Sequence, residues 1–171
     1  MAPWKTPAVA DSIDVFQDLV GDLDYPMLVV TANDGEERSG CLVGFSTQCS
    51  IDPARFVICV SQRNHTHGVA LRSTHLGVHF LGNGDEEVAS LFGEQSGDDV
   101  DKFAMCEWSD GPHGVPIVAG CRGWFVGALV RTSEAGDHTI FLVEVVAAGR
   151  GRGEGQLSFQ MAREMTPGHE A

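Results

Sequence analysis

Hydrophobic and polar residues alternate along most of this chain with the two-residue period of short β-strands, and few stretches show helical spacing. In the clearest helical stretch, 11–23, apolar residues recur at intervals of three and four from Ile13 to Leu23. Asp11 or Ser12 is the expected N-cap. The other expected helices are 67–73 and 85–94. The expected strands are 26–32, 38–43, 55–60, 76–81, 115–118, 123–131 and 139–148, with 157–160 as a closing strand.

About seven short strands with only small helices between them predict a mainly β fold, a barrel or a sandwich, and exclude a βαβ sheet. Turn signals support this: Asn33-Asp34-Gly35 and the segment 134–137 are typical of hairpins, and the glycine-rich segment 149–155 indicates a flexible connection. The sequence has no internal repeat and no dividing linker. We therefore expect one domain at 26–160, an N-terminal extension with a helix at 1–25 and a tail at 161–171.

The composition of the chain limits the kinds of molecule that it is expected to bind. Of the 171 residues, 43% are hydrophobic and 20% charged, which is typical of a globular chain, and the net charge is −13. Such an acidic balance argues against nucleic acid, whose binding depends on clustered basic residues. Neither a membrane-spanning run nor the apolar core of a signal peptide occurs, so we expect no membrane association and a cytoplasmic location. The five cysteines lack paired spacing and are expected to be reduced.

The stretch 44–50 lies between two expected strands and contains small and hydroxylated residues. Small side chains allow the backbone to approach a bound molecule closely, and hydroxyl groups can bind an anionic or amide-rich ligand. Taken alone, the same stretch is better described as a merely polar hairpin connection.

Several familiar motifs are absent. The chain contains no dinucleotide-binding glycine fingerprint, no phosphate-binding loop and no serine-hydrolase or zinc-protease signature. The pairs His65/His67 and His75/His79 lack a third ligand near them in sequence, so no metal site is expected.

Five short motifs nevertheless follow one another in an order that resembles the flavin reductase family. The motifs are Asp34-Gly35, F-S-T-Q-C-S-I-D-P at 45–53, N-H-T-H at 64–67, D-K-F at 101–103 and G-D-H-T-I-F-L-V-E-V at 136–145. This family comprises FMN-binding split β-barrels related to the reductase components of two-component flavin monooxygenases. The resemblance covers about 26–160. The chain departs from the family pattern at Phe45, Gln48 and Ala54, which affects the expected flavin type and contacts more than the fold.

The resemblance implies a Greek-key-like split β-barrel and an NAD(P)H:flavin oxidoreductase. Hydride would pass from the nicotinamide to FMN, with FAD as the alternative flavin, and the reduced flavin would supply a partner monooxygenase. It also implies a homodimer with the flavin at the subunit interface. Two other interpretations stay open: a split barrel that uses a deazaflavin or another reductant, and a non-catalytic flavin- or haem-binding module.

The resemblance also assigns residues. His138 would be the catalytic residue, near the flavin and the nicotinamide. The residues implied in cofactor binding are Val43, Gly44, Phe45, Ser46, Thr47, Ser50, Ser61, Arg63, Asn64, Thr66, His67, Lys102 and Phe103. Without the resemblance, His138 is simply the exposed start of a strand and Arg63 a solvated cation.

Overall fold

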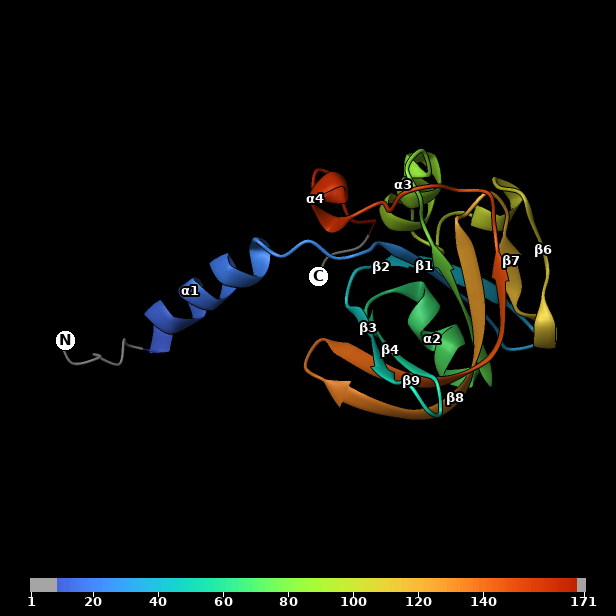
Figure 1. Cartoon of the computed structure of the whole chain (residues 1–171), viewed down its shortest axis with the longest axis horizontal. Coiled ribbons are helices and arrows are strands. Elements are labelled where there is room, and N and C mark those ends of the chain that lie inside the picture. Colours follow the sequence, from blue (N-terminus) through green and yellow to red (C-terminus); the bar gives the residue numbers. More distant parts are fainter. Residues whose placement is uncertain (1–8, 169–171) are drawn as a thin grey trace.

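The computed structural model describes residues 9–168, with side chains from Ser12 onward. Its centre is a seven-stranded sheet in the order β2-β1-β5-β8-β9-β4-β3, with antiparallel neighbours throughout (Figure 1). Its strands are β1 (Leu28–Asn33), β2 (Arg38–Val43), β3 (Ser46–Ser50), β4 (Arg55–Ser61), β5 (His75–Phe80), β8 (Gly123–Ala135) and β9 (His138–Arg150). A second sheet pairs β6 (Trp108–Asp110) with β7 (Pro116–Val118). The mainly β fold with short helices predicted from the sequence is confirmed.

The large sheet curves round so that β2, at one edge, comes into contact with β4 near the other edge. No ladder joins β2 to β3 in the part of the chain that the structure describes. The barrel is therefore split along this line, and the cavity considered below lies at the split.

Strand β1 lies in the middle of the core because both of its faces are buried. Leu28 and Val30 point into the barrel, while Val29 belongs to a second apolar cluster on the outer side of the sheet. Helix α2 (His65–Arg72) packs against the inner cluster, and helix α3 (Glu86–Glu94) packs over β2. This double burial explains the nearly continuous apolar run at the start of the domain.

Helix α2 is fixed at its first turn. The Asn64 side chain accepts a hydrogen bond of 2.9 Å from the backbone N–H of Thr66, as expected of an N-cap. The hydroxyl of Thr66 is 2.9 Å from that of Ser39 on β2, and both side chains are buried. The helix is thereby joined to the edge strand at the split.

The stretch 44–50, expected to connect two strands, contains a strand of its own. Strand β3 pairs with β4, with Ser46 opposite Ile58. Most of its side chains are exposed at the edge of the sheet, so they show no alternation of hydrophobic and polar residues. That exposure is the reason why the sequence pattern missed it.

The predictions for the C-terminal part were partly wrong. The expected strand 157–160 makes only an isolated bridge between Pro26 and Ser158, after which the short helix α4 (Phe159–Ala162) begins. The segment 149–155 is not a free connection throughout, because β9 continues to Arg150 opposite Gly123. Glycines within this ladder concealed the strand in the sequence.

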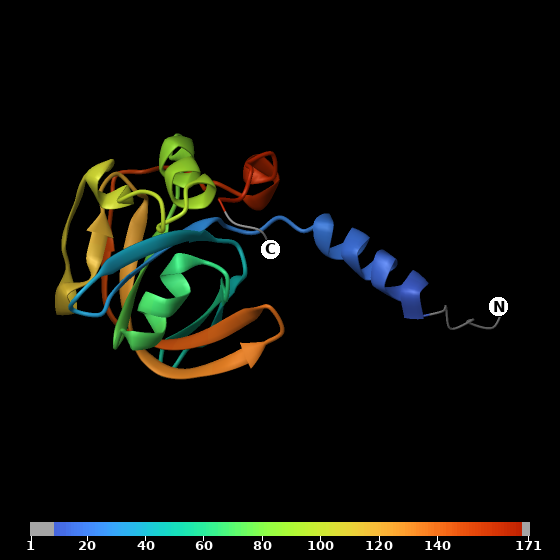
Figure 2. The same ribbon diagram turned by 180° about the vertical axis from the view of Figure 1, so that it is seen from behind.

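Helix α1 (Val9–Gly21) extends away from the barrel, and the opposite view shows the same separation (Figures 1 and 2). The short 3-10 helices η1 (Lys102–Ala104) and η2 (Pro112–Gly114) complete the elements. Within residues 9–168, no helix combines the length and apolar character needed to cross a membrane.

His79 is the most deeply buried titratable ring of the barrel wall. Its Nδ1–H donates to the carbonyl of Val29 at 3.0 Å, and its Nε2 accepts from the N–H of Val118 at 3.1 Å. Burial lowers its pKa from 6.5 to about 4, and the bond to Val29 opposes this only in part. A proton on Nε2 would face another N–H, so the fold requires the neutral ring.

We expect His79 to make stability decrease as the pH falls from 6.5 to about 4. The unfolded chain takes up the proton first as the pH falls. The contribution of His79 to the free energy of unfolding is therefore complete above pH 6.5 and lost below pH 4, a decrease of about 3 kcal/mol. His79→Gln retains one donor and one acceptor but does not titrate. Urea unfolding across this pH range should give a smaller slope for His79→Gln than for the unmodified protein, and equal slopes would contradict the assignment.

Candidate functional site

A cavity of about 220 Å³ opens at the split of the barrel, and we call it the site cavity. It is lined by the ends of β2 and β4, the start of β9 and residues from both ends of the domain. Its lining consists of Tyr25, Met27, Cys41, Leu42, Val43, Gly44, Phe45, Cys59, Val60, Ser61, Asn64, His138 and Phe159. The lining is mostly apolar and aromatic, with polar groups concentrated at the β4–β9 end.

Aromatic rings form one wall of the site cavity. Tyr25 stacks on Phe159 with ring centroids 4.7 Å apart, and it lies 6.3 Å from Phe45. The Phe45 ring lies 5.3 Å from that of His138 and is 55% exposed. Burial raises the pKa of the Tyr25 hydroxyl. A flat apolar ligand would find rings on this wall and the aliphatic side chains of the barrel opposite.

Gly44 allows this arrangement because no larger residue fits beside Tyr25. A Cβ atom at Gly44 would lie 2.7 Å from the Cε2 atom of Tyr25. Because there is no side chain, the main chain itself forms part of the cavity surface, and backbone groups can contact a ligand.

The polar end of the site cavity is formed by facing residues of two strands. Ser61 on β4 pairs with His138 on β9, and Asp137 precedes it in the hairpin turn. The Nδ1 of His138 is 2.8 Å from a carboxylate oxygen of Asp137. The hydrogen bond from His138 lowers the pKa of Asp137, aided by the charges of His138 and Arg63.

This geometry sets the His138 tautomer. Since the Asp137 carboxylate only accepts hydrogen bonds, Nδ1 carries a hydrogen, and Nε2 makes no hydrogen bond to another described residue. The backbone carbonyl of Asp137 also accepts from the N–H of Gln62 at 2.9 Å, which fixes the turn. The ring is therefore oriented, with one nitrogen left for a ligand.

The structure brings together six of the residues that the resemblance assigned to the site. They are Val43, Gly44, Phe45, Ser61, Asn64 and His138. Ser46 lines an adjoining cavity of about 430 Å³, which we call the elbow cavity because it lies where α1 joins the barrel. The Ser46 hydroxyl oxygen is buried and has no hydrogen-bond partner among the described residues. Thr47, Ser50 and Arg63 do not line either cavity.

Thr66 and His67 lie next to the site cavity but use their side chains elsewhere. Thr66 contacts Ser39, as described above, and the Nε2 of His67 is 2.8 Å from the hydroxyl of Thr139. Burial lowers the pKa of His67, consistent with a neutral ring. Both residues support the walls of the cavity and do not line it.

Lys102 and Phe103 belong to another cavity, of about 330 Å³, which also involves Arg38 and His65. Lys102 is only 4% exposed and donates to the carbonyls of Gly40, at 3.1 Å, and Phe92, at 3.2 Å. Burial lowers the pKa of its ammonium group. Lys102 anchors η1 to β2 and α3, and it does not reach the site cavity.

Tyr25 and Phe159 are residues of the site cavity that the sequence analysis did not identify. They meet because Pro26 pairs with Ser158, and the N–H of Phe159 donates to the carbonyl of Tyr25 at 2.8 Å. An isolated bridge between the two ends of a domain has no periodicity. The sequence offered one signal for this contact, an aromatic residue next to each of the two bridge residues Pro26 and Ser158.

Comparisons with known proteins agree with this architecture. The family described as "Flavin reductase like domain" matches residues 20–165. The chain is 34% identical over 132 residues to an NADH-dependent FAD reductase of Streptomyces globisporus, an alignment that covers 76% of this chain and 72% of the relative. It is 28% identical over 144 residues to the stachydrine N-demethylase reductase subunit Stc3 of Rhizobium meliloti, covering 81% of this chain and 60% of that subunit.

A solved structure shows the same fold. The NADH:FAD oxidoreductase SgcE6 of Streptomyces globisporus C-1027 superposes with a TM-score of 0.75 at 31% identity, covering 86% of this chain and 88% of that one. Its agreement with the present sheet confirms the split-barrel prediction. The chain therefore belongs to the flavin reductase-like domain family, the family of NAD(P)H-dependent flavin reductases and of reductase components of two-component monooxygenases.

Proposed function

We propose that this protein is an NAD(P)H-dependent flavin reductase that binds FMN in the site cavity and uses His138 to orient the reacting rings. The observation that carries this proposal is the position of His138, held by Asp137 at the polar end of an otherwise apolar and aromatic cavity. No triad or pair of catalytic carboxylates is required, because the main task of the protein is to stack two rings and exclude water.

The residues present are suited to a flavin. The flat apolar ring would lie against the Tyr25–Phe159 wall, and the backbone at Gly44 would face its polar edge. The unpartnered Ser46 hydroxyl provides a buried donor and acceptor close by. The cavity of about 220 Å³ suits one flat ring system.

The phosphate would lie near Ser61 and Asn64, which line the polar end of the site cavity. Arg63 lies between them in sequence and close enough to Asp137 to help lower the pKa of that carboxyl group. We propose Arg63 as the charge partner of the phosphate, because a guanidinium group matches phosphate oxygens in charge and geometry.

When bound, the flavin supplies the ring nitrogen that accepts a hydride from the nicotinamide. His138 would hold a hydrogen bond to the bound rings through Nε2, while Asp137 keeps Nδ1 protonated. Phe45, across from His138, would cover the rings from solvent. These groups limit the mutual orientation of the reactants, which is the main source of rate enhancement available to such a site.

The assembly is part of the same proposal. We infer a homodimer in which the exposed side of the site cavity, including Phe45, is covered by a second subunit. Reduced flavin would then pass to a partner monooxygenase. Relatives described as reductase subunits support this role, although the chain covers only 60% of the length of the Rhizobium meliloti subunit.

We expect anaerobic addition of NADH or NADPH to bleach FMN at catalytic concentrations of this protein. His138→Ala should lower kcat/KM by about 10- to 100-fold through loss of orientation. Asp137→Asn should cause a smaller loss of the same kind, since it removes only the carboxylate that fixes the ring. His75→Ala, on a remote part of β5, serves as the matched control and should retain full activity.

The alternatives give different outcomes in the same assay. Reduction by a reduced deazaflavin but by neither nicotinamide would reject NAD(P)H as the donor. Bound FMN that no donor reduces would reject the enzymatic function. A lower KM for FAD than for FMN would reject the flavin preference alone.

Gly44→Ala should weaken FMN binding about tenfold or more, because the added methyl group would compete with Tyr25 for the same space. Fluorescence titration of FMN measures this. Gly68→Ala is the control, since a Cβ there meets only the flexible end of Arg72 at 3.5 Å. If Gly44→Ala binds FMN normally, the flavin does not lie beside Gly44.

A further inference from the structure

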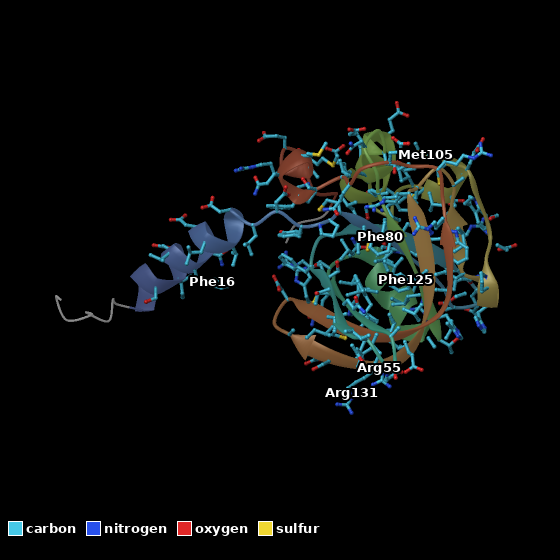
Figure 3. The ribbon with its side chains drawn as sticks, viewed as in Figure 1. Phe16, Arg55, Phe80, Met105, Phe125 and Arg131 are labelled. Carbon is cyan, nitrogen blue, oxygen red and sulfur yellow. The ribbon has the colours of Figure 1, made fainter. Side chains whose placement is uncertain are left out.

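Helix α1 presents a large apolar stripe to solvent. Ile13, Phe16 and Leu19 are 55%, 57% and 63% exposed, and Val15 is more than half exposed as well, as is Leu23 just beyond the helix. Figure 3 shows Phe16 on the projecting helix, apart from the barrel. Contiguous exposed apolar side chains of this size are uncommon on an isolated globular chain and indicate a contact surface.

The helix cannot place this stripe on its own barrel without breaking its anchor. The side-chain amide of Gln160 donates to the carbonyls of Gly21 and Leu23, each at 2.9 Å. The N–H of Gln160 donates to the carboxylate of Asp24 at 3.0 Å. These three bonds fix the C-terminal end of α1 and direct the helix away from the domain (Figures 1 and 2).

The polar face of α1 has a single sign of charge. Asp14 and Asp18 lie one turn apart, and Asp22 follows at the same spacing just beyond the helix. The sequence has no lysine or arginine between Lys5 and Arg38. A surface that accommodates α1 must therefore be apolar in its centre and basic at its border.

The barrel carries a surface of that kind. Phe80, Trp124 and Phe125 line a cavity of about 420 Å³ whose border includes Arg122 and Arg150, and we call it the arginine pocket. Figure 3 shows Phe80 and Phe125 in the barrel, remote from Phe16 on α1. Both arginines are exposed, and neither forms an ion pair with a described residue. Two exposed basic residues without an ion pair to a described residue are notable in a chain with a net charge of −13.

We propose that α1 of one chain docks in the arginine pocket of a second copy, with Phe16 against the aromatic floor and the Asp14–Asp18 row facing Arg122 and Arg150. The exchange is reciprocal, so that the dimer has twofold symmetry and two identical arm contacts. Both complementary surfaces are on the same chain and cannot meet within it, which is why the occupant is a second copy. The proposal depends on surface chemistry alone and is independent of flavin reduction.

The first test is the mass of the full chain in sedimentation equilibrium at several concentrations. The expected mass is twice that of the 18.3 kDa chain. Phe16→Asp should raise the dimer dissociation constant at least tenfold, with an unchanged far-ultraviolet spectrum as evidence of folding. A monomeric wild-type chain, an open-ended series of oligomers, or a dimer that Phe16→Asp does not weaken would each overturn the proposal.

Charge reversal separates this interface from any other. One chain carries Asp14→Lys and Asp18→Lys, and a second carries Arg122→Glu and Arg150→Glu. Each alone should dimerise at least tenfold more weakly, because arm and pocket then have the same sign of charge. An equimolar mixture should form a heterodimer, in which both reciprocal contacts are again between opposite charges.

Arg131→Glu is the matched control, since Arg131 is an exposed arginine at a different place on β8, as Figure 3 shows. Arg131→Glu changes the net charge by as much as each of the arginine substitutions in the arginine pocket. It should nevertheless leave the dissociation constant of the dimer unchanged. Loss of dimer in this control would show that net charge governs association. Failure of the two reversed chains to associate when mixed would show that the arm does not dock in the arginine pocket, and either result would overturn the proposal. Since FMN reduction is measured separately, failure of either proposal would be distinguishable from failure of the other.

Discussion

The split between β2 and β4 determines where this barrel can hold a ligand. A closed barrel would pair every edge strand, whereas here β2 and β3 remain at the two edges of the sheet. Helix α2 occupies the gap, capped by Asn64 and joined to β2 through Thr66 and Ser39. The gap that remains beside this helix becomes the site cavity, so the same feature that leaves the barrel open creates the place for a ligand.

The strand period explains how residues close in sequence come to serve different purposes. On β2, Cys41 and Val43 face the interior and line the site cavity, whereas Gly40 faces α3 and η1. Lys102 bonds to the carbonyl of Gly40 and is therefore held away from the cavity. The D-K-F motif thus contributes to the site by fixing the edge strand that forms one of its walls.

Much of the fold was readable from the sequence because its signals are local. The alternating pattern, the Asn33–Gly35 turn and the 134–137 hairpin predicted the strands on either side of them. Strand β3 could not be recognised, since its exposed edge position removes alternation, and the bridge between Pro26 and Ser158 is a single long-range contact. The family resemblance made Gly44, Asn64 and His138 candidates, and the structure places them in the lining of the site cavity. Tyr25 and Phe159 line the same cavity but were missed, because their meeting depends on tertiary geometry alone.

Tyr25 connects the projecting helix to the site. It lines both the site cavity and the elbow cavity, and Val20 and Leu23 at the base of α1 line the latter. Its ring packs between Phe45 and Phe159 within this small region. A change in the direction of α1 at its Gln160 anchor would move residues that adjoin Tyr25. Through Tyr25 it would move the aromatic wall beside Gly44. A docked arm would hold this wall in one position, so assembly and ligand binding share a physical element even though each can be measured without the other.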